Sequence, residues 1–149
     1  MRDLEPILAV AAKLAAPFDL KTMLREVVNA AKQVLESERA TVWLYDPKAD
    51  ELLLEVATDV EAIRIPAGMG LVGSCARNRQ LINVLDCYAD ARFDPSMDKR
   101  TGYRTRCMLT LPLVDHKDQL VGVMQVLNKA DGVYEASDEQ LATDRKSVV

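Results

Sequence analysis

The chain has 149 residues, enough for one domain, and an apolar fraction of 49% can fill a single core. Its net charge of −4 argues against a nucleic-acid-binding surface, and no apolar run approaches the ~20 residues of a membrane span. Residues 1–18 carry the acidic side chains of Asp3 and Glu5, which argues against a signal peptide. Three widely spaced cysteines do not form a disulfide framework, so we expect a reducing, cytoplasmic setting.

Two amphipathic helices are predicted at the N-terminus. In residues 3–16 apolar side chains recur at helical spacing as far as Pro17, which cannot continue a helix. We assign residues 1–17 to a terminal helix that packs on its own domain, on a second copy of the chain, or on both. The remaining domain, 18–149, opens with a helix that has Asp19 as its N-cap and runs to about Glu36, with the apolar pattern of a core-covering helix.

The middle of the chain predicts a sheet. Apolar runs bounded by turn residues indicate strands over 40–45, 51–57, 62–65, 80–84, 106–114 and 119–127. A helix over 71–78 follows the turn at Gly68–Gly70, and residues 86–103 are expected to be mostly loop, with room for one helical turn. Pro112 indicates an edge or a bulge in its strand. This order predicts an α+β domain, an antiparallel sheet with helices on one or both faces.

The last strand and the helix after it are the most informative stretch. Alternation places Val123 and Gln125 on one face of the strand and Met124 on the other. Beyond the turn at 131–132, Ser137 is the expected N-cap of the last helix, with Gln140 completing a capping box. Residues 144–147 break the apolar stripe of that helix, so we expect a truncated C-terminal helix in a fragment of a longer protein.

Spacing within this stretch carries a family signature. Asn128-Lys129, the aromatic Tyr134 and then Asp138-Glu139 resemble the N-K-(x)n-F-x3-D-E motif of GAF domains, with tyrosine for phenylalanine. The narrower resemblance is to the regulatory GAF domains of cyclic-nucleotide phosphodiesterases and bacterial adenylyl cyclases. It implies a six-stranded antiparallel sheet flanked by helices and a Lys129–Asp138 pair that holds a lid over a nucleotide. Without the resemblance, the pair would only fasten a loop to a helix, which contributes little if exposed.

Two further stretches carry the resemblance and imply ligand contacts. Residues 65–73, IPAGMGLVG, are similar to the family's I-P-x-x-x-G-(I/L)-x-G, in which the residues after the second glycine, here Leu71 and Val72, offer backbone amides to the cyclic phosphate. A lone Gly-x-Gly also forms ordinary turns. Residues 86–105 are similar to D-A-Y-x-D-x-R-F followed by T-G-(F/Y)-x-T, which implies that Asp98, Thr101 and Thr105 contact base and ribose. Residue type alone favours turn and strand roles for these three.

Register within the family implies four more contact positions: Thr41, Ala57, Thr58 and Gln125. Three of them depart from the best-matching relatives. Ala57 and Thr58 stand where an aromatic residue and an aspartate are usual, and Gln125 replaces an acidic residue. An amide offers both a donor and an acceptor, so we expect these departures to change affinity and base preference more than the fold.

One enzymatic alternative comes from Cys75, Cys87 and Cys107. Free methionine sulfoxide reductases, another GAF lineage, use pocket cysteines, and a thiolate near a helix start is activated. Against this, Cys107 alternates with apolar residues as a core side chain does, and that lineage lacks the N-K…D-E signature. His116 has no evident metal-binding or catalytic partner. We therefore expect no catalytic residue, no metal and no cofactor.

Together these features predict a regulatory domain of a larger signalling protein. It would bind cAMP or cGMP without converting it, and relay closure of the 86–105 loop and the 128–138 lid to an output domain. A homodimer through the terminal helices is expected, with no nucleic-acid or membrane partner. The alternative is the same scaffold binding another small ligand or serving only to dimerise.

Overall fold

The computed structural model of the protein describes residues 17–56, 63–115 and 117–143. A six-stranded antiparallel sheet of order β3-β2-β1-β6-β5-β4 forms its centre. The elements in chain order are α2 (Pro17–Val34), β1 (Ser37–Asp46), β2 (Glu51–Val56), β3 (Arg64–Pro66), α3 (Gly70–Asn78), β4 (Ile82–Val84), a short 3-10 turn (Cys87–Ala89), α4 (Ser96–Thr101), β5 (Met108–Val114), β6 (Leu120–Lys129) and α5 (Ala136–Thr143). The predicted α+β class is confirmed. The predicted helix 1–17 lies, apart from Pro17, outside the described residues.

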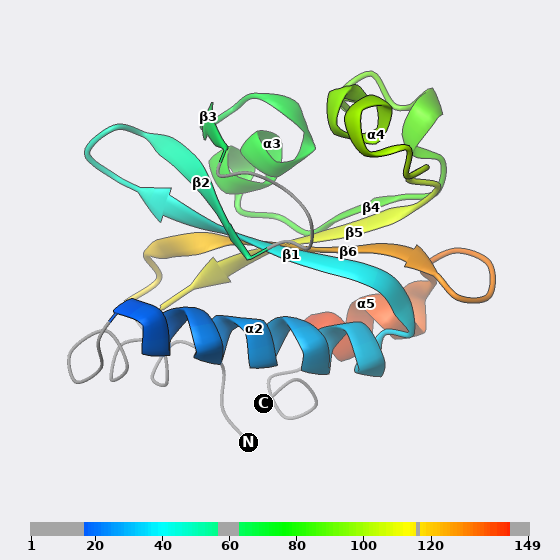
Figure 1. The fold of residues 1–149 in the computed structure, drawn as a ribbon, viewed down its shortest axis with the longest axis horizontal. Coiled ribbons are helices and arrows are strands. Elements are labelled where there is room, and N and C mark those ends of the chain that lie inside the picture. The colour runs from blue at the N-terminus through cyan, green and yellow to red at the C-terminus, as the bar shows by residue number, and fades with distance from the viewer. Residues whose placement is uncertain (1–16, 57–62, 116, 144–149) are drawn as a thin grey trace.

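Helices cover both faces of the sheet. Figure 1 shows α2 and α5 on one face and α3 and α4 on the other. On the α2 face, Met124 and Val126 of β6 pack with Val28 and Ala31 of α2. On the α3 face, Val123 packs with Val72 and other side chains of α3. The alternation predicted for the last strand therefore separates two apolar cores, one on each side of the sheet.

The central strand pair, β1 and β6, approaches closely at Gly122. A Cβ at this position would lie 2.2 Å from the carbonyl oxygen of Trp43. Pro112 lies next to β6, opposite Val123, but β4 pairs with β5 only as far as Thr110. β5 therefore has a free edge beside Pro112, and its register with β6 shifts between Leu113 and Val114, which agrees with the predicted edge or bulge. None of the described helices is long and apolar enough to cross a membrane.

Both predicted helix caps were wrong. α2 already includes Pro17, so Asp19 lies inside the helix and is not its N-cap. In α5 the carbonyl of Glu135 accepts the N–H of Glu139 at 3.0 Å, so Glu135 rather than Ser137 holds the capping position. Asp138, three residues on, accepts the N–H of Glu135 at 2.8 Å, which is the half of a capping box that Gln140 was expected to supply.

Candidate functional site

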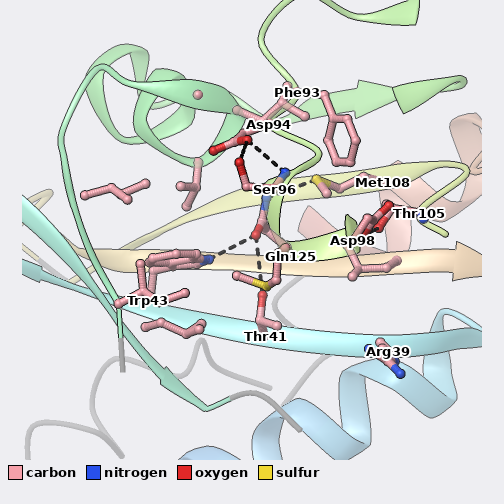
Figure 2. Close-up of a pocket in the computed structure, with 18 of the residues that line it drawn as sticks. Arg39, Thr41, Trp43, Phe93, Asp94, Ser96, Asp98, Thr105, Met108 and Gln125 are labelled. Atoms are coloured by element: carbon pink, nitrogen blue, oxygen red, sulfur yellow. Dashed lines mark hydrogen bonds between the residues drawn. The ribbon is translucent and has the colours of Figure 1, made fainter. Parts of the chain in front are cut away.

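A cavity of about 500 Å³ lies between the sheet and the helices α3 and α4. Its floor comes from β1, β5 and β6, one side from the start of α3, and its roof from the segment 93–105 (Figure 2). Each candidate ligand residue that the structure describes lines this cavity: Thr41, Leu71, Val72, Asp98, Thr101, Thr105 and Gln125. Ala57 and Thr58 lie outside the described residues.

A polar cluster around Gln125 forms the centre of the floor. The Gln125 side chain is 8% exposed, and its Oε1 accepts the indole N–H of Trp43 at 3.0 Å. The hydroxyl of Thr41 donates to the same oxygen at 3.4 Å. Gln125 Nε2 donates to the sulfur of Met108 at 3.0 Å and to the hydroxyl of Thr110 at 3.4 Å. The glutamine thus links three neighbouring strands beneath the cavity.

The start of α3 offers backbone donors on one side of the cavity. Met69 has the extended backbone of an N-cap residue, but its side chain makes no capping hydrogen bond. The first hydrogen bond of the helix runs from the N–H of Gly73 to the Met69 carbonyl at 3.1 Å. The preceding N–H groups, those of Gly70, Leu71 and Val72, therefore have no acceptor within the helix. Such unpaired N–H groups and the positive end of the helix dipole favour an anion.

Glycine at position 73 is required for this arrangement. A Cβ there would lie 2.8 Å from the backbone nitrogen of Gly68. Gly68 itself, at φ +92°, donates its N–H to the Gly73 carbonyl at 2.9 Å, which folds the loop back onto the helix. The turn and the first turn of α3 therefore form one compact unit facing the cavity.

Hydrogen bonds hold the roof in place. The buried carboxylate of Asp98 accepts the N–H of Thr105 at 2.7 Å, the hydroxyl of Thr105 at 2.8 Å and the hydroxyl of Tyr88 at 2.7 Å. The hydroxyl of Thr101 donates to the Met97 carbonyl at 3.0 Å. These groups are already engaged in hydrogen bonds, although Asp98 and Thr101 lie in α4 and Thr105 lies before β5, not in the turns and the strand that residue type alone had favoured. The hydrogen bonds between Asp98 and Thr105 thus stabilise the roof itself, and a contact with a ligand would be made in addition to them.

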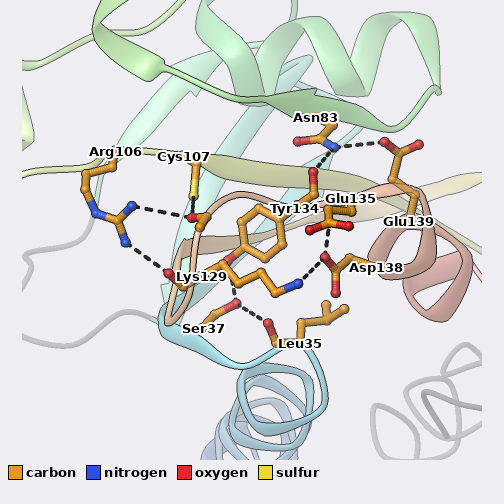
Figure 3. A network of polar contacts seen from close by, with 11 residues as sticks. Leu35, Ser37, Asn83, Arg106, Cys107, Lys129, Tyr134, Glu135, Asp138 and Glu139 are labelled. Atoms are coloured by element: carbon orange, nitrogen blue, oxygen red, sulfur yellow. Dashed lines mark hydrogen bonds and ion pairs between the residues drawn. The ribbon is translucent and has the colours of Figure 1, made fainter.

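Four residues of the N-K…D-E motif take part in a polar network at the end of β6: Lys129, Tyr134, Asp138 and Glu139 (Figure 3). Lys129 Nζ lies 2.6 Å from Asp138 Oδ2, with both side chains largely buried, and this hydrogen bond raises the pKa of Lys129. Tyr134 is buried with α2 and its hydroxyl meets that of Ser37. Asn83 donates to Glu139 at 2.8 Å.

The expected position of this motif as a lid above the ligand is wrong. Tyr134 packs on the α2 face of the sheet, whereas the cavity lies on the α3 face. None of Asn128, Lys129, Tyr134, Asp138 and Glu139 is among the described residues that line the cavity. The motif therefore ties β6 to α5 and to the start of β1, and the roof is formed by the 93–105 segment instead.

The GAF-domain family model matches residues 19–144. This chain belongs to the GAF family. Its GAF domain is 33% identical over 105 residues to the cGMP-specific 3′,5′-cyclic phosphodiesterase of Drosophila melanogaster and 32% identical to that of Drosophila virilis. The match covers 69% of this chain but only 9% and 12% of those proteins. The chain thus spans about a tenth of the length of these relatives.

Solved structures confirm the GAF fold at lower identity. The GAF domain of a phosphoenolpyruvate-protein phosphotransferase from Coxiella burnetii matches with a TM-score of 0.72 at 18% identity, covering 97% of this chain and 87% of that one. A free methionine-R-sulfoxide reductase from Neisseria meningitidis, solved with its substrate, matches with a TM-score of 0.66 at 19% identity, covering 95% and 80%. At these identities the matches show the fold alone.

The cysteines of this GAF domain lie away from the described cavity. Cys75, Cys87 and Cys107 are all free and buried, and none is among the described residues that line the cavity. Burial raises the pKa of Cys75 and Cys87 to about 12, so both remain thiols at neutral pH. Among the described residues, no group of histidine, cysteine and acidic side chains could hold a metal ion.

Sequence reasoning missed several residues of this GAF cavity, above all Trp43. Trp43 is 6% exposed and anchors Gln125 from the neighbouring strand. Its position two residues after Thr41 places both side chains on the same face of β1, so strand periodicity could have found it. Met108, Phe93 and Arg39 also line the cavity. Phe93 ends the D-A-Y-x-D-x-R-F match, and Arg39 lies two residues before Thr41 on β1, so both could have been found in the same way; Met108 carried no such signal.

Proposed function

We propose that this GAF domain binds a cyclic nucleotide, cAMP or cGMP, as the regulatory part of a larger signalling protein, and that it does not convert the ligand. The observation that carries the proposal is the cavity of about 500 Å³, bordered by the unpaired N–H groups at the start of α3 and floored by the Gln125 cluster. This volume lies within the range of about 300–1,000 Å³ typical of small-molecule sites.

The two ends of a cyclic nucleotide match two parts of the cavity. The single negative charge of a cyclic phosphate suits the N-terminus of α3, where Leu71 and Val72 line the wall. The apolar side chains on the other walls suit a purine ring: Leu54, Ile63, Ile65, Phe93, Met97 and Leu127. Polar groups of Thr41 and Gln125 are available on the floor to orient the base.

The relatives support the same ligand class. Those reported above are named as cGMP-specific 3′,5′-cyclic phosphodiesterases, and this chain matches only about a tenth of their length. A match confined to so small a part of these enzymes is what we expect if this chain corresponds to a regulatory domain and not to their catalytic domain. A non-catalytic role also agrees with the three buried cysteines that lie away from the cavity. The free thiols are consistent with a cytoplasmic setting.

The second candidate function is a GAF scaffold that binds another small molecule or serves only as a dimerisation module. We include a homodimer through the terminal helices in the proposal, and sedimentation equilibrium of the full chain tests it. A monomer at all accessible concentrations would remove the dimer without affecting the ligand site.

Trp43 provides a direct test of ligand binding. It is the single tryptophan of the chain and it lines the cavity, so its fluorescence reports occupancy. We expect a saturable change with cGMP or cAMP, confirmed by calorimetry at one ligand per chain, and no change with inorganic phosphate. Recovery of unaltered nucleotide after prolonged incubation checks that the domain does not turn it over. No response to millimolar concentrations of both nucleotides would overturn the proposal in favour of the second candidate.

A further inference from the structure

The orientation of the Gln125 amide is fixed by its neighbour. An indole nitrogen can only donate a hydrogen bond, so the amide atom 3.0 Å from Trp43 Nε1 must be the oxygen. A flipped amide would place two donors against each other in a buried position, since Trp43 is 6% and Gln125 8% exposed. The Thr41 hydroxyl donates to the same oxygen at 3.4 Å. The strong contact of Gln125 Oε1 is thus with the indole N–H, which fixes the amide with its Nε2 on the side of Met108.

The Gln125 nitrogen is the half of the amide that a ligand can use. Its two contacts are the Met108 sulfur at 3.0 Å and the Thr110 hydroxyl at 3.4 Å. A thioether is a weak acceptor, and a contact of 3.4 Å is a weak hydrogen bond. Gln125 and Met108 both line the cavity, and Figure 2 shows the glutamine standing on the floor between Trp43 and Met108. Because methionine side chains adapt readily, a ligand oxygen can replace the sulfur as the acceptor.

We propose that Trp43 makes Gln125 a hydrogen-bond donor in the cavity, and that this site consequently selects a 6-keto purine, cGMP, over a 6-amino purine, cAMP. The inference rests on the proposed function and assigns its base preference. Guanine presents an acceptor at O6, whereas adenine presents a donor at N6. The Nε2 donor of Gln125 is matched by O6 and opposed by N6.

Three cyclic nucleotides separate the contribution of the keto oxygen from the rest of the base. Cyclic IMP keeps O6 but lacks the 2-amino group of cGMP. We expect cGMP and cyclic IMP to bind with similar affinity, each about tenfold or more tighter than cAMP, because cAMP both loses a hydrogen bond and leaves a donor facing a donor. Trp43 fluorescence and calorimetry measure these affinities in the wild-type chain.

Two variants test the mechanism. Trp43→Phe keeps an aromatic ring but removes the indole N–H, so the Gln125 amide can flip. The ratio of cGMP affinity to cAMP affinity should then fall towards one. Because this variant has no tryptophan, calorimetry measures its affinities. Gln125→Glu offers acceptors only and should invert the ratio, while its charge weakens both ligands. Tyr45→Phe, on the same face of β1 but absent from the cavity lining, is the matched aromatic control and should leave the ratio unchanged.

The outcomes distinguish this inference from the proposed function. Equal affinity for all three nucleotides, a preference for cAMP, or a preference that survives unchanged in a folded Trp43→Phe variant would overturn the inference and leave the proposed function standing. Binding of none of the three would overturn both. A ligand-free readout also exists, because the single tryptophan gives one indole N–H resonance. That proton should exchange slowly in the wild type and rapidly in Gln125→Leu; rapid exchange in the wild type would refute the fixed amide.

Discussion

At the start of α3, a methionine occupies the position where many helices carry a capping side chain. Met69 has φ −101° and ψ 132°, the backbone that capping residues adopt, yet it is 59% exposed and makes no capping hydrogen bond. A side chain that capped this helix would engage the same N–H groups that we assign to the phosphate. Leaving the cap open costs stability and keeps the donors available to a ligand.

Replacing Met69 with aspartate should therefore change stability and affinity in opposite directions. Met69→Asp should stabilise the fold by about 1 kcal/mol in urea unfolding and weaken cyclic nucleotide binding by about tenfold or more, because its carboxylate occupies and repels the anion site. Met69→Asn caps the helix without charge and is the matched control, with a smaller loss of affinity. If asparagine weakened binding as much as aspartate, charge at the helix start would not explain the effect.

Gly122 is a residue where one added methyl group should be costly. A Cβ would lie 2.2 Å from the Trp43 carbonyl oxygen, between two backbones that cannot easily separate. We expect Gly122→Ala to lower the free energy of unfolding by about 3 kcal/mol or more. Gly132→Ala is the control, because its Cβ meets nothing within 4 Å and only the positive φ of +84° opposes it; about 1 kcal/mol is expected. Equal losses in urea unfolding would contradict the steric argument.

Among the elements, α5 shows most clearly what the sequence could not reveal. Ser137 is a good capping residue by type, but Asp138 accepts both the Glu135 N–H at 2.8 Å and the Lys129 ammonium at 2.6 Å. An ion pair with a residue nine positions earlier thus moved the helix start by two residues. Local capping rules do not contain that long-range partner, so they placed the boundary wrongly.

The Lys129–Asp138 pair leads to a prediction about stability and pH. Asp138→Asn keeps an acceptor for the Glu135 N–H but removes the charge next to a lysine that is only 12% exposed, and should cost about 2 kcal/mol. The pair raises the pKa of Lys129 in the folded state. Its contribution is therefore complete below the unfolded pKa of about 10.4 and is lost as pH rises through the higher folded value.

The stability difference between wild type and Asp138→Asn should accordingly narrow at strongly alkaline pH. Urea unfolding of both chains at neutral pH and above about pH 10.4 measures this difference. Tyrosine ionisation also destabilises the fold at that pH, but it acts on both chains and cancels in the comparison. A difference that stayed constant across this range would show that the ion pair contributes nothing.

At the scale of elements, periodicity predicted nearly all of the fold. The pattern in α2 and the alternation in β6 fixed which side chains share a face, and the strands of the sheet were found with boundaries shifted by a few residues. The same pattern cannot say which face carries a cavity, because both faces of β6 are apolar. The N-K…D-E network was for this reason expected above the ligand, although Tyr134 packs below the sheet with α2.

Across the whole molecule, Asn128 connects the cavity roof to the rest of the domain. Asn128 has a positive φ of +56°, and its side chain is buried. The side chain contacts the segment that follows α4. Its Oδ1 accepts the N–H of Arg106 at 2.5 Å and of Cys107 at 3.2 Å, and its Nδ2 donates to the Tyr103 hydroxyl and the Arg104 carbonyl, both at 2.8 Å. One amide thereby holds the base of the roof.

A second connection leads from the same end of β6 to α2. The hydroxyl of Tyr134 meets that of Ser37, which donates to the Leu35 carbonyl at 3.2 Å, just after the last turn of α2. The N–H of Ala130 donates to the Glu36 carbonyl at 2.7 Å. A change in the roof can therefore reach the end of α2 through contacts that meet at residues 128–134. This arrangement gives a concrete route for the proposed relay.

Hydrogen exchange can test this route in the cyclic nucleotide complex. In the wild type we expect ligand to slow exchange in the roof, residues 96–106, and also around Leu35–Ser37. Asn128→Gly keeps the positive φ but removes the amide, so affinity should fall and both effects should shrink. Tyr134→Phe leaves the roof intact, so affinity and roof protection should persist while protection around Leu35–Ser37 is lost. If both variants kept the distant protection, the coupling would run through the sheet or α3 and not through the end of β6.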